Sequence, residues 1–125
     1  MKAITGFLLS VSTMELIMQK PFNPILGETL QVYVGGIPLY YEQISHHPPI
    51  SSYFMKCDEF TLFGNLNAVA NVSLNSGSGG NAGMMTVVMR NGNEFLLSFP
   101  LAEISGLIYG TRKYSILGKC FAIQK

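Results

Sequence analysis

The sequence predicts a mainly β protein, an antiparallel meander of short strands led by one N-terminal helix. Runs rich in β-branched and aromatic residues alternate with turn residues along most of the chain. The dipeptide Gly35-Gly36 is typical of a two-residue hairpin turn, because its residues tolerate positive φ. Asn91-Gly92 is a strong local signal for a second hairpin. The run from Met84 to Met89 is apolar at nearly every position. A strand that is apolar on both faces must be covered on both.

Two arrangements satisfy this requirement. A wide β-barrel covers one face of each strand with a bound apolar ligand. A sheet packed on both sides by other protein satisfies it equally well, and the pattern alone leaves both open.

The first expected element is an amphipathic helix. Apolar residues at helical spacing share one face, namely Ile4, Phe7, Leu8, Val11, Met14 and Met18. The same segment imitates a signal peptide, with Lys2 before an apolar run. The stripe continues past any cleavage point, which favours the helix. Pro21 and Pro24 then forbid regular helix and impose an extended path.

The remainder is expected to be β. The expected strands are 29–34, 37–44, 50–56, 60–66, 68–74, 84–90, 94–99, 107–111, 113–117 and 120–123. Residues 75–83 are rich in glycine, serine and asparagine, but they lack the Gly-Lys-Ser/Thr ending and the following helix of a phosphate-binding loop. We therefore expect a mobile hairpin loop there. Internal repeats and interdomain linkers are absent from the sequence.

Bulk composition narrows the function classes. The chain has 125 residues, a formal net charge of +1, 12% charged residues and 48% hydrophobic residues. So little net charge gives no strong global field toward nucleic acid or an anionic membrane and makes any attraction to phosphate local. No stretch reaches the roughly 20 apolar residues that span a bilayer. Cys57 and Cys120 lack the CxxC spacing, which favours buried free thiols over a disulfide.

The first candidate site is segment 42–49, which reads Glu-Gln-Ile-Ser-His-His-Pro-Pro. In extended backbone His46 and His47 would point to opposite sides, which suits neither a metal pair nor a shared acid–base role. The two prolines bend the chain and can bring both imidazoles to a rim, where they offer donors to an anion. Phosphate recognition, catalysis or metal binding, and purely structural histidines all remain open on these residues. A hydrolase using Ser45 is disfavoured, because no nucleophile elbow is present.

The second candidate site is segment 20–28, which reads Lys-Pro-Phe-Asn-Pro-Ile-Leu-Gly-Glu. Lys20 is a compact cation with three donors and suits phosphate as a point charge. Asn23 lies between prolines that hold it in one conformation at little entropic cost. Glu28 can orient Lys20 or accept from a ligand hydroxyl. The alternative is a lone surface lysine beside a rigid turn.

Together the two segments resemble the oxysterol-binding protein family. Its fingerprint is Glu-Gln-x-Ser-His-His-Pro-Pro, here at 42–49, and the preceding element Lys-Pro-x-Asn-Pro-x-x-Gly-Glu occurs here at 20–28. Residues 98–100 and 106–110 resemble the later strands of the same domain. The resemblance implies an incomplete antiparallel β-barrel around a tunnel that holds one lipid, a sterol or another membrane lipid. Most members also take phosphatidylinositol 4-phosphate, with its headgroup at the tunnel mouth.

Carried over by position, Lys20 and Asn23 would contact the phosphates of the lipid, and His46 with His47 would hold the 4-phosphate. Glu28 would be a neighbour of this site. The resemblance implies no catalytic residue, metal or cofactor, because the family exchanges two lipids between membranes and breaks no bond. The alternative is a lipid sensor or scaffold that recognises the headgroup without transferring lipid.

The resemblance also has consequences for location and extent. It identifies the apolar N-terminal residues as the helix that precedes segment 20–28, and not as a signal peptide. We therefore expect a cytoplasmic protein that contacts membranes peripherally and transiently. The family domain is roughly three times as long as this chain. Residues 1–125 would then be the central part of that domain, with the N-terminal lid and the C-terminal helical part missing. Exposed sheet edges in such a part favour homo-oligomers.

Overall fold

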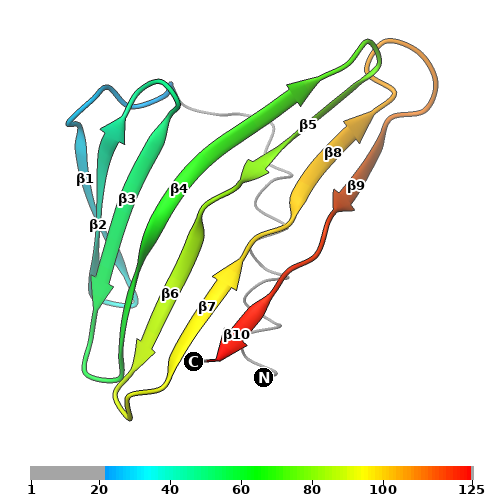
Figure 1. Ribbon diagram of the computed structural model, residues 1–125. Helices are drawn as coiled ribbons and strands as arrows, with labels where there is room; N and C mark the ends of the chain where they lie inside the picture. The colour runs from blue at the N-terminus through cyan, green and yellow to red at the C-terminus, as the bar shows by residue number, and fades with distance from the viewer. Residues whose placement is uncertain (1–21, 125) are drawn as a thin grey trace.

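The computed structural model describes residues 22–124, so the expected N-terminal helix lies outside the described residues. Ten strands form one antiparallel sheet (Figure 1). They are β1 (Thr29–Val34), β2 (Ile37–Ser45), β3 (Ile50–Lys56), β4 (Phe60–Val72), β5 (Ser76–Asn81), β6 (Met84–Met89), β7 (Glu94–Ser98), β8 (Leu101–Ser105), β9 (Lys113–Leu117) and β10 (Ala122–Gln124).

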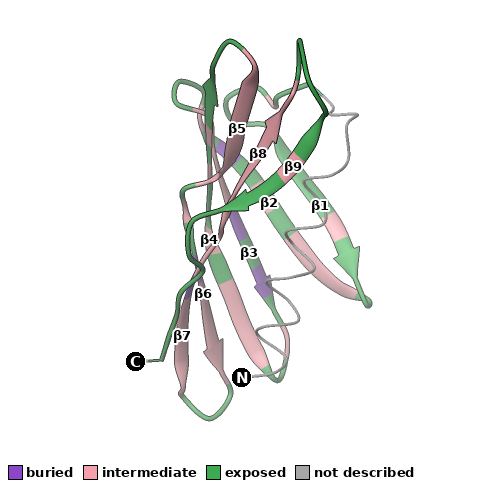
Figure 2. Ribbon diagram, turned by 90° about the vertical axis from the view of Figure 1, so that its right-hand side faces the viewer, coloured by how far each residue is buried: buried purple, intermediate pink, exposed green. Residues whose placement is uncertain are grey.

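The sheet is a meander, which confirms the predicted fold class. Its main path runs β1-β2-β3-β4-β5-β8-β9, while β6 pairs with β4 and β7, and β7 pairs with β10. Figures 1 and 2 show that the sheet curves without closing, with β1 at one edge and β9 and β10 at the other. The described strands therefore form an incomplete barrel.

Strand β4 is the longest element and organises the sheet. Along one edge it pairs with β3, and along the other it pairs first with β6 and then with β5. The register is continuous, since Phe60 lies opposite Met89 and Val72 lies opposite Gly77. The two strands expected at 60–66 and 68–74 are therefore one. The interruption lies instead in the chain that pairs with β4, at residues 82–83 between β5 and β6. There the Asn81 side chain accepts from the backbone N–H of Asn67 at 2.8 Å.

The expected loop at 75–83 is wrong, because most of it is strand β5. This strand is hydrogen-bonded on both sides, to β4 and to β8. A Cβ atom on Gly80 would lie 2.9 Å from Cδ2 of Leu101, and one on Gly79 would lie 3.2 Å from the carbonyl oxygen of Val69. The glycines thus allow close approach of neighbouring strands. Pairing on two edges outweighs their low intrinsic β propensity.

The expected strand at 107–111 is also wrong. The strand lies earlier, as β8, and residues 107–111 form a loop. Gly106 has φ +73° and Gly110 has φ +86°, backbone conformations that interrupt a strand. Residues 99–100 separate β7 from β8, because Pro100 has no N–H for the ladder. The segments 98–100 and 106–110, read from the sequence as parts of the later strands, therefore lie largely in connections. The last strand begins at Ala122, two residues later than expected.

The core is small and lies on one face of the sheet. Tyr53, Met85 and Leu97 are its buried members, with exposures of 5%, 9% and 3%. The rings of Tyr41 and Tyr53 are tilted at 48° with centroids 5.9 Å apart. Burial raises the pKa of the Tyr41 hydroxyl, and burial together with the neighbouring Tyr41 raises the pKa of Tyr53 well above its usual range. Figure 2 shows how little of the sheet is buried, and many large apolar side chains are exposed.

Two glycines in the same region give a matched test of close strand approach. A Cβ atom on Gly83 would collide with the carbonyl oxygen of Asn65, whereas one on Gly77 would meet nothing nearer than 3.8 Å. We expect Gly83→Ala to lower the free energy of unfolding by about 2 kcal/mol, the usual cost of overpacking. Gly77→Ala should leave it unchanged or raise it slightly. Urea denaturation measures both, and equal stabilities would contradict the close approach.

Candidate functional site

The two sequence motifs meet where β1 begins and β2 ends. The β1–β2 hairpin folds back at Gly35 and Gly36, which have positive φ as expected for this turn. The backbone N–H of Gly27 donates to the carbonyl oxygen of Gln43 at 2.8 Å. The N–H of Gln43 donates in return to the carbonyl oxygen of Glu28 at 2.9 Å. The end of segment 20–28 is therefore joined to the start of segment 42–49 by main-chain hydrogen bonds.

Glu28 closes a tight turn ahead of β1. Its N–H donates to the carbonyl oxygen of Ile25 at 3.0 Å, and its Oε2 accepts from the N–H of Ile25 at 2.9 Å. Gly27 has φ +79°, which is the conformation that a type II turn requires at its third residue. One carboxylate oxygen of Glu28 thus has a structural task. Its expected place beside a bound headgroup stays a prediction.

Gln43 is a positioning residue that the sequence alone did not single out. It is 3% exposed and is the one buried side chain among residues 22–124 that is an amide or carries a charge. Its Nε2 donates to the carbonyl oxygen of Ser45 at 2.7 Å, and its Oε1 accepts from Oγ of Ser51. A signal was available, because Leu39, Tyr41 and Gln43 alternate along β2 and so share the core face.

The Gln43 side chain spans a β-bulge. Gln43 lies opposite Ser51 and Ser45 lies opposite Ile50, so Ile44 is an extra residue in β2. A bulge bends its strand and re-aims the residues that follow. Here those residues are the two histidines.

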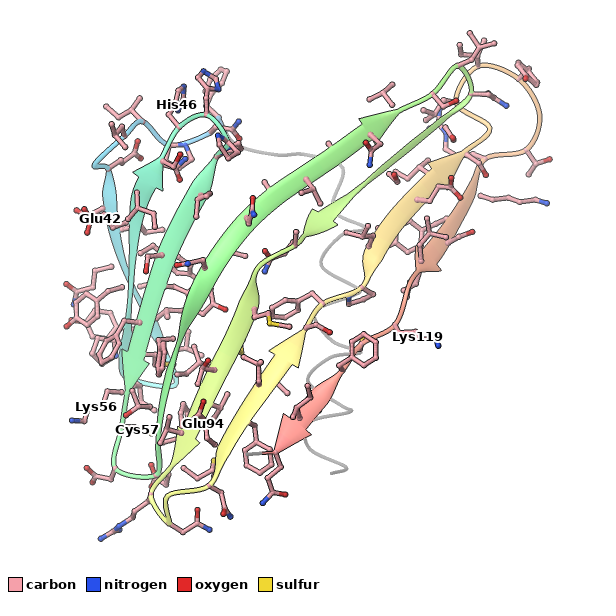
Figure 3. All side chains as sticks on the ribbon, in the orientation of Figure 1. Glu42, His46, Lys56, Cys57, Glu94 and Lys119 are labelled. Carbon is pink, nitrogen blue, oxygen red and sulfur yellow. The ribbon has the colours of Figure 1, made fainter. Side chains whose placement is uncertain are left out.

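His46 and His47 lie in the turn between β2 and β3, and both are exposed. Their ring centroids are 4.5 Å apart and their planes are inclined at 60°. They do not point to opposite sides, as they would in extended backbone, because the backbone leaves the extended conformation at His46. Figure 3 shows His46 at the rim where β2 ends. Two adjacent imidazoles at a rim can both donate to one anion.

The other predicted site residues are less well placed by the structure. Asn23 is exposed in the segment before the Glu28 turn. Lys20 lies outside the described residues, so its proximity to the histidines stays a prediction. Main-chain hydrogen bonds join Glu28 to Gln43, which precedes His46 by three residues in the chain.

Three further observations bear on the chemistry. Among residues 22–124, no group of three or more His, Cys, Asp or Glu side chains is arranged to hold a metal ion. Within the same range no helix has the length and apolarity needed to cross a membrane. Cys57 and Cys120 are free thiols, as predicted, but neither is buried: Cys57 is half-buried and Cys120 is exposed.

Comparison with known proteins decides the family. The sequence model of the oxysterol-binding protein family matches residues 1–124. The chain belongs to this family. Oxysterol-binding protein 9 of Dictyostelium discoideum is 32% identical over 122 residues, covering 95% of this chain and 28% of the relative. Oxysterol-binding protein-related protein 8 of Homo sapiens is 34% identical over 110 residues, covering 81% of this chain and 12% of the relative. This oxysterol-binding family member thus spans less than a third of the length of these relatives.

Solved structures show the same fold. The ORD domain of Osh1 in complex with cholesterol matches with a TM-score of 0.74 and 26% identity, over 84% of this chain and 27% of that one. The Osh3 ORD domain from Saccharomyces cerevisiae, in complex with PI(4)P, matches with a TM-score of 0.77 and 24% identity, over 86% of this chain and 30% of that one. The open sheet of this oxysterol-binding family member is therefore the fold of part of an ORD domain.

Removing the Gln43 side chain should destabilise the fold and displace the two histidines. We expect Gln43→Ala to lower the free energy of unfolding by about 2 kcal/mol, since the hydroxyl of Ser51 and the carbonyl oxygen of Ser45 lose their partner. The matched control is Gln31→Ala, because Gln31 is exposed on β1 and should cost under about 0.5 kcal/mol. Urea denaturation gives the stabilities, and imidazole NMR shifts report displacement of the histidines. Unchanged shifts in Gln43→Ala would contradict its positioning role.

Proposed function

We propose that this chain binds membrane lipids and that His46 and His47 recognise the phosphorylated headgroup of phosphatidylinositol 4-phosphate. The observation that carries the proposal is the pair of exposed imidazoles, 4.5 Å apart on a turn that follows the Gln43 bulge. Family membership and the likeness to the Osh3 domain, whose structure contains PI(4)P, support it.

The physical basis is hydrogen bonding to a multiply charged anion. A phosphate monoester carries about −1.5 to −2 charges at neutral pH and offers three strong acceptor oxygens. Hydrogen bonds to such an anion are stronger than neutral ones. We propose that Lys20 adds a point charge and that Asn23 adds amide donors, both contacting the phosphates. We propose that Glu28 lies beside these two residues and holds the turn that precedes β1.

The apolar face of the sheet supplies the second half of the proposal. The core residues, with Leu39, Leu62, Val87, Phe95 and Phe99 packed against them, form a continuous apolar wall. We propose that this wall is part of a lipid tunnel that takes a sterol or another lipid in exchange for phosphatidylinositol 4-phosphate. Exchange moves lipids between membranes and requires no enzymatic step. The protein would act in the cytoplasm, in transient contact with membrane surfaces.

The free edge of the sheet supports a proposal about assembly. Strand β1 pairs with β2 on one side and has no partner strand on the other among the described residues. Leu30, Tyr33 and Val34 of this edge strand are more than half exposed. We propose that this edge allows self-association through strand pairing.

The headgroup assignment is tested by His46→Ala combined with His47→Ala. We expect about a hundredfold loss of affinity for phosphatidylcholine vesicles containing phosphatidylinositol 4-phosphate, since two hydrogen bonds to a charged group are lost. Lys119→Ala, an exposed charge far from the histidines in Figure 3, is the control and should bind normally. Vesicle sedimentation measures both. Undiminished binding by the double variant, with its circular dichroism intact, would overturn the assignment.

The alternative function is a sensor or scaffold that recognises the headgroup without transferring lipid. A transfer assay separates the two functions. Exchange predicts that a fluorescent sterol moves from donor vesicles to acceptor vesicles containing phosphatidylinositol 4-phosphate, and that the double histidine variant does not accelerate it. Headgroup binding without any sterol movement would instead establish the sensor.

A further inference from the structure

Two loops that are distant in the sequence form one tip at an end of the sheet. The first is the turn between β4 and β5, and the second is loop 106–112 between β8 and β9. Oδ1 of Asn75 accepts from the N–H groups of Ile108 at 2.9 Å and Tyr109 at 3.1 Å. Nδ2 of Asn75 donates to the carbonyl oxygen of Tyr109 at 3.0 Å. The main-chain carbonyl of Asn75 accepts from Leu107 N–H at 3.2 Å. Asn75 therefore clamps the second loop to the first.

The side chains displayed by this tip are apolar and face solvent. We call the following five residues the apolar tip: Val72 (87% exposed), Leu74 (76%), Leu107 (41%), Ile108 (72%) and Tyr109 (64%). Loops at the surface normally carry polar residues. Adjoining exposed apolar side chains are a mark of an interaction site.

The shape of the tip is built into the backbone. Gly106 has φ +73°, and a Cβ atom on it would collide with the carbonyl oxygen of Thr111. Gly110 has φ +86°. The two glycines let the loop turn tightly at both ends, and the hydrogen bonds of Asn75 hold it in the middle. The apolar side chains are thus presented outward by a constrained loop and do not fold back onto the sheet.

The apolar tip projects from the same end of the sheet as the histidines. Ile50, which follows the histidine turn, pairs with Asn67. Strand β4 continues beyond this pair to Val72, on the order of 16 Å at about 3.3 Å per residue. Figures 1 and 3 show the β4–β5 hairpin and His46 at the upper end of the same sheet. A flat surface that approaches the histidines would therefore also meet the tip.

The charges beside the tip are positive. Arg112 and Lys113 are exposed at the end of the second loop. Neither loop contains an acidic residue, since no Asp or Glu occurs between residues 60 and 93 or after Glu103, which lies within β8. A chain of net charge +1 thus has a local cationic apolar end. Apolar and aromatic side chains backed by Lys and Arg are the composition of segments that enter the interface of anionic membranes.

We infer that the apolar tip inserts into the headgroup region of an anionic bilayer, with Arg112 and Lys113 against the lipid phosphates. A bilayer fits better than a protein partner, because a protruding tip needs a deformable apolar medium and a protein would need a complementary pocket. Tyr109 suits the interface, where its ring is buried and its hydroxyl stays hydrated. The inference goes beyond headgroup recognition, since it requires no phosphoinositide and assigns which end of the sheet meets the membrane.

The test uses the fact that the 125-residue chain contains no tryptophan. Ile108→Trp places a fluorescent probe in the tip. Ile123→Trp is the matched control, because Ile123 is 51% exposed on β10 at the opposite end of the sheet. Vesicles of phosphatidylcholine and phosphatidylserine, without phosphoinositide, should shift the fluorescence of the Ile108→Trp variant to the blue, and brominated acyl chains should quench it. The control probe should show neither effect. No change at position 108, or equal changes at both positions, would overturn the inference.

Further variants separate insertion from other uses of the tip. Leu74→Ser combined with Ile108→Ser should reduce vesicle partitioning at least about tenfold. Arg112→Gln combined with Lys113→Gln should reduce it roughly tenfold on phosphatidylserine vesicles and little on pure phosphatidylcholine. The double histidine variant should partition normally here, so failure of the headgroup proposal leaves this result intact. If the serine variant instead abolishes self-association in sedimentation, with vesicle affinity unchanged, the tip is an interface between copies and the inference fails.

Discussion

The buried amide of Gln43 is the constraint on which the candidate site depends. An unpaired polar group in the core costs free energy, so the Gln43 side chain must find partners, and it finds them in Ser45 and Ser51. Those partners lie on either side of the bulge at Ile44. The main chain of the same residue holds the end of the preceding motif. One residue thus couples the turn before β1, the bulge in β2 and the direction of the histidine turn.

The rest of the sheet is arranged around the long strand β4. Its first half supports β6 and its second half supports β5, so a single strand connects the small core to the distant hairpin tip. Breaks occur next to β4 at residues 82–83, where the Asn81 side chain accepts from the N–H of Gly83, and one strand further out at 99–100, where Pro100 has no N–H. Such breaks let the sheet curve. Curvature gives the sheet a face that can surround an apolar ligand.

The distribution of apolar side chains is consistent with a protein that works against lipid. Few side chains are buried, and they lie together near the middle of the sheet. Exposed ones occur on the edge strand β1 and at the projecting hairpins, and also on the central strands, as at Tyr40, Phe54 and Phe63. The apolar tip, with Arg112 and Lys113 beside it, lies at the same end of the sheet as His46 and His47, and we propose that this end meets the membrane. Headgroup recognition and membrane contact would then occur in one orientation, since both features lie at that end.

The sequence by itself determined the family, the antiparallel meander and the limits of most strands. Alternating apolar residues and the Gly35-Gly36 and Asn91-Gly92 turns are local signals, and local signals survive into the fold. Tertiary structure alone decided three other features. Ser76–Asn81 became a strand because β4 and β8 hydrogen-bond it from both sides, and 107–111 became a loop because its flanking glycines take positive φ. The two imidazoles lie side by side because the chain leaves the extended conformation after the bulge at Ile44, which the buried Gln43 side chain spans.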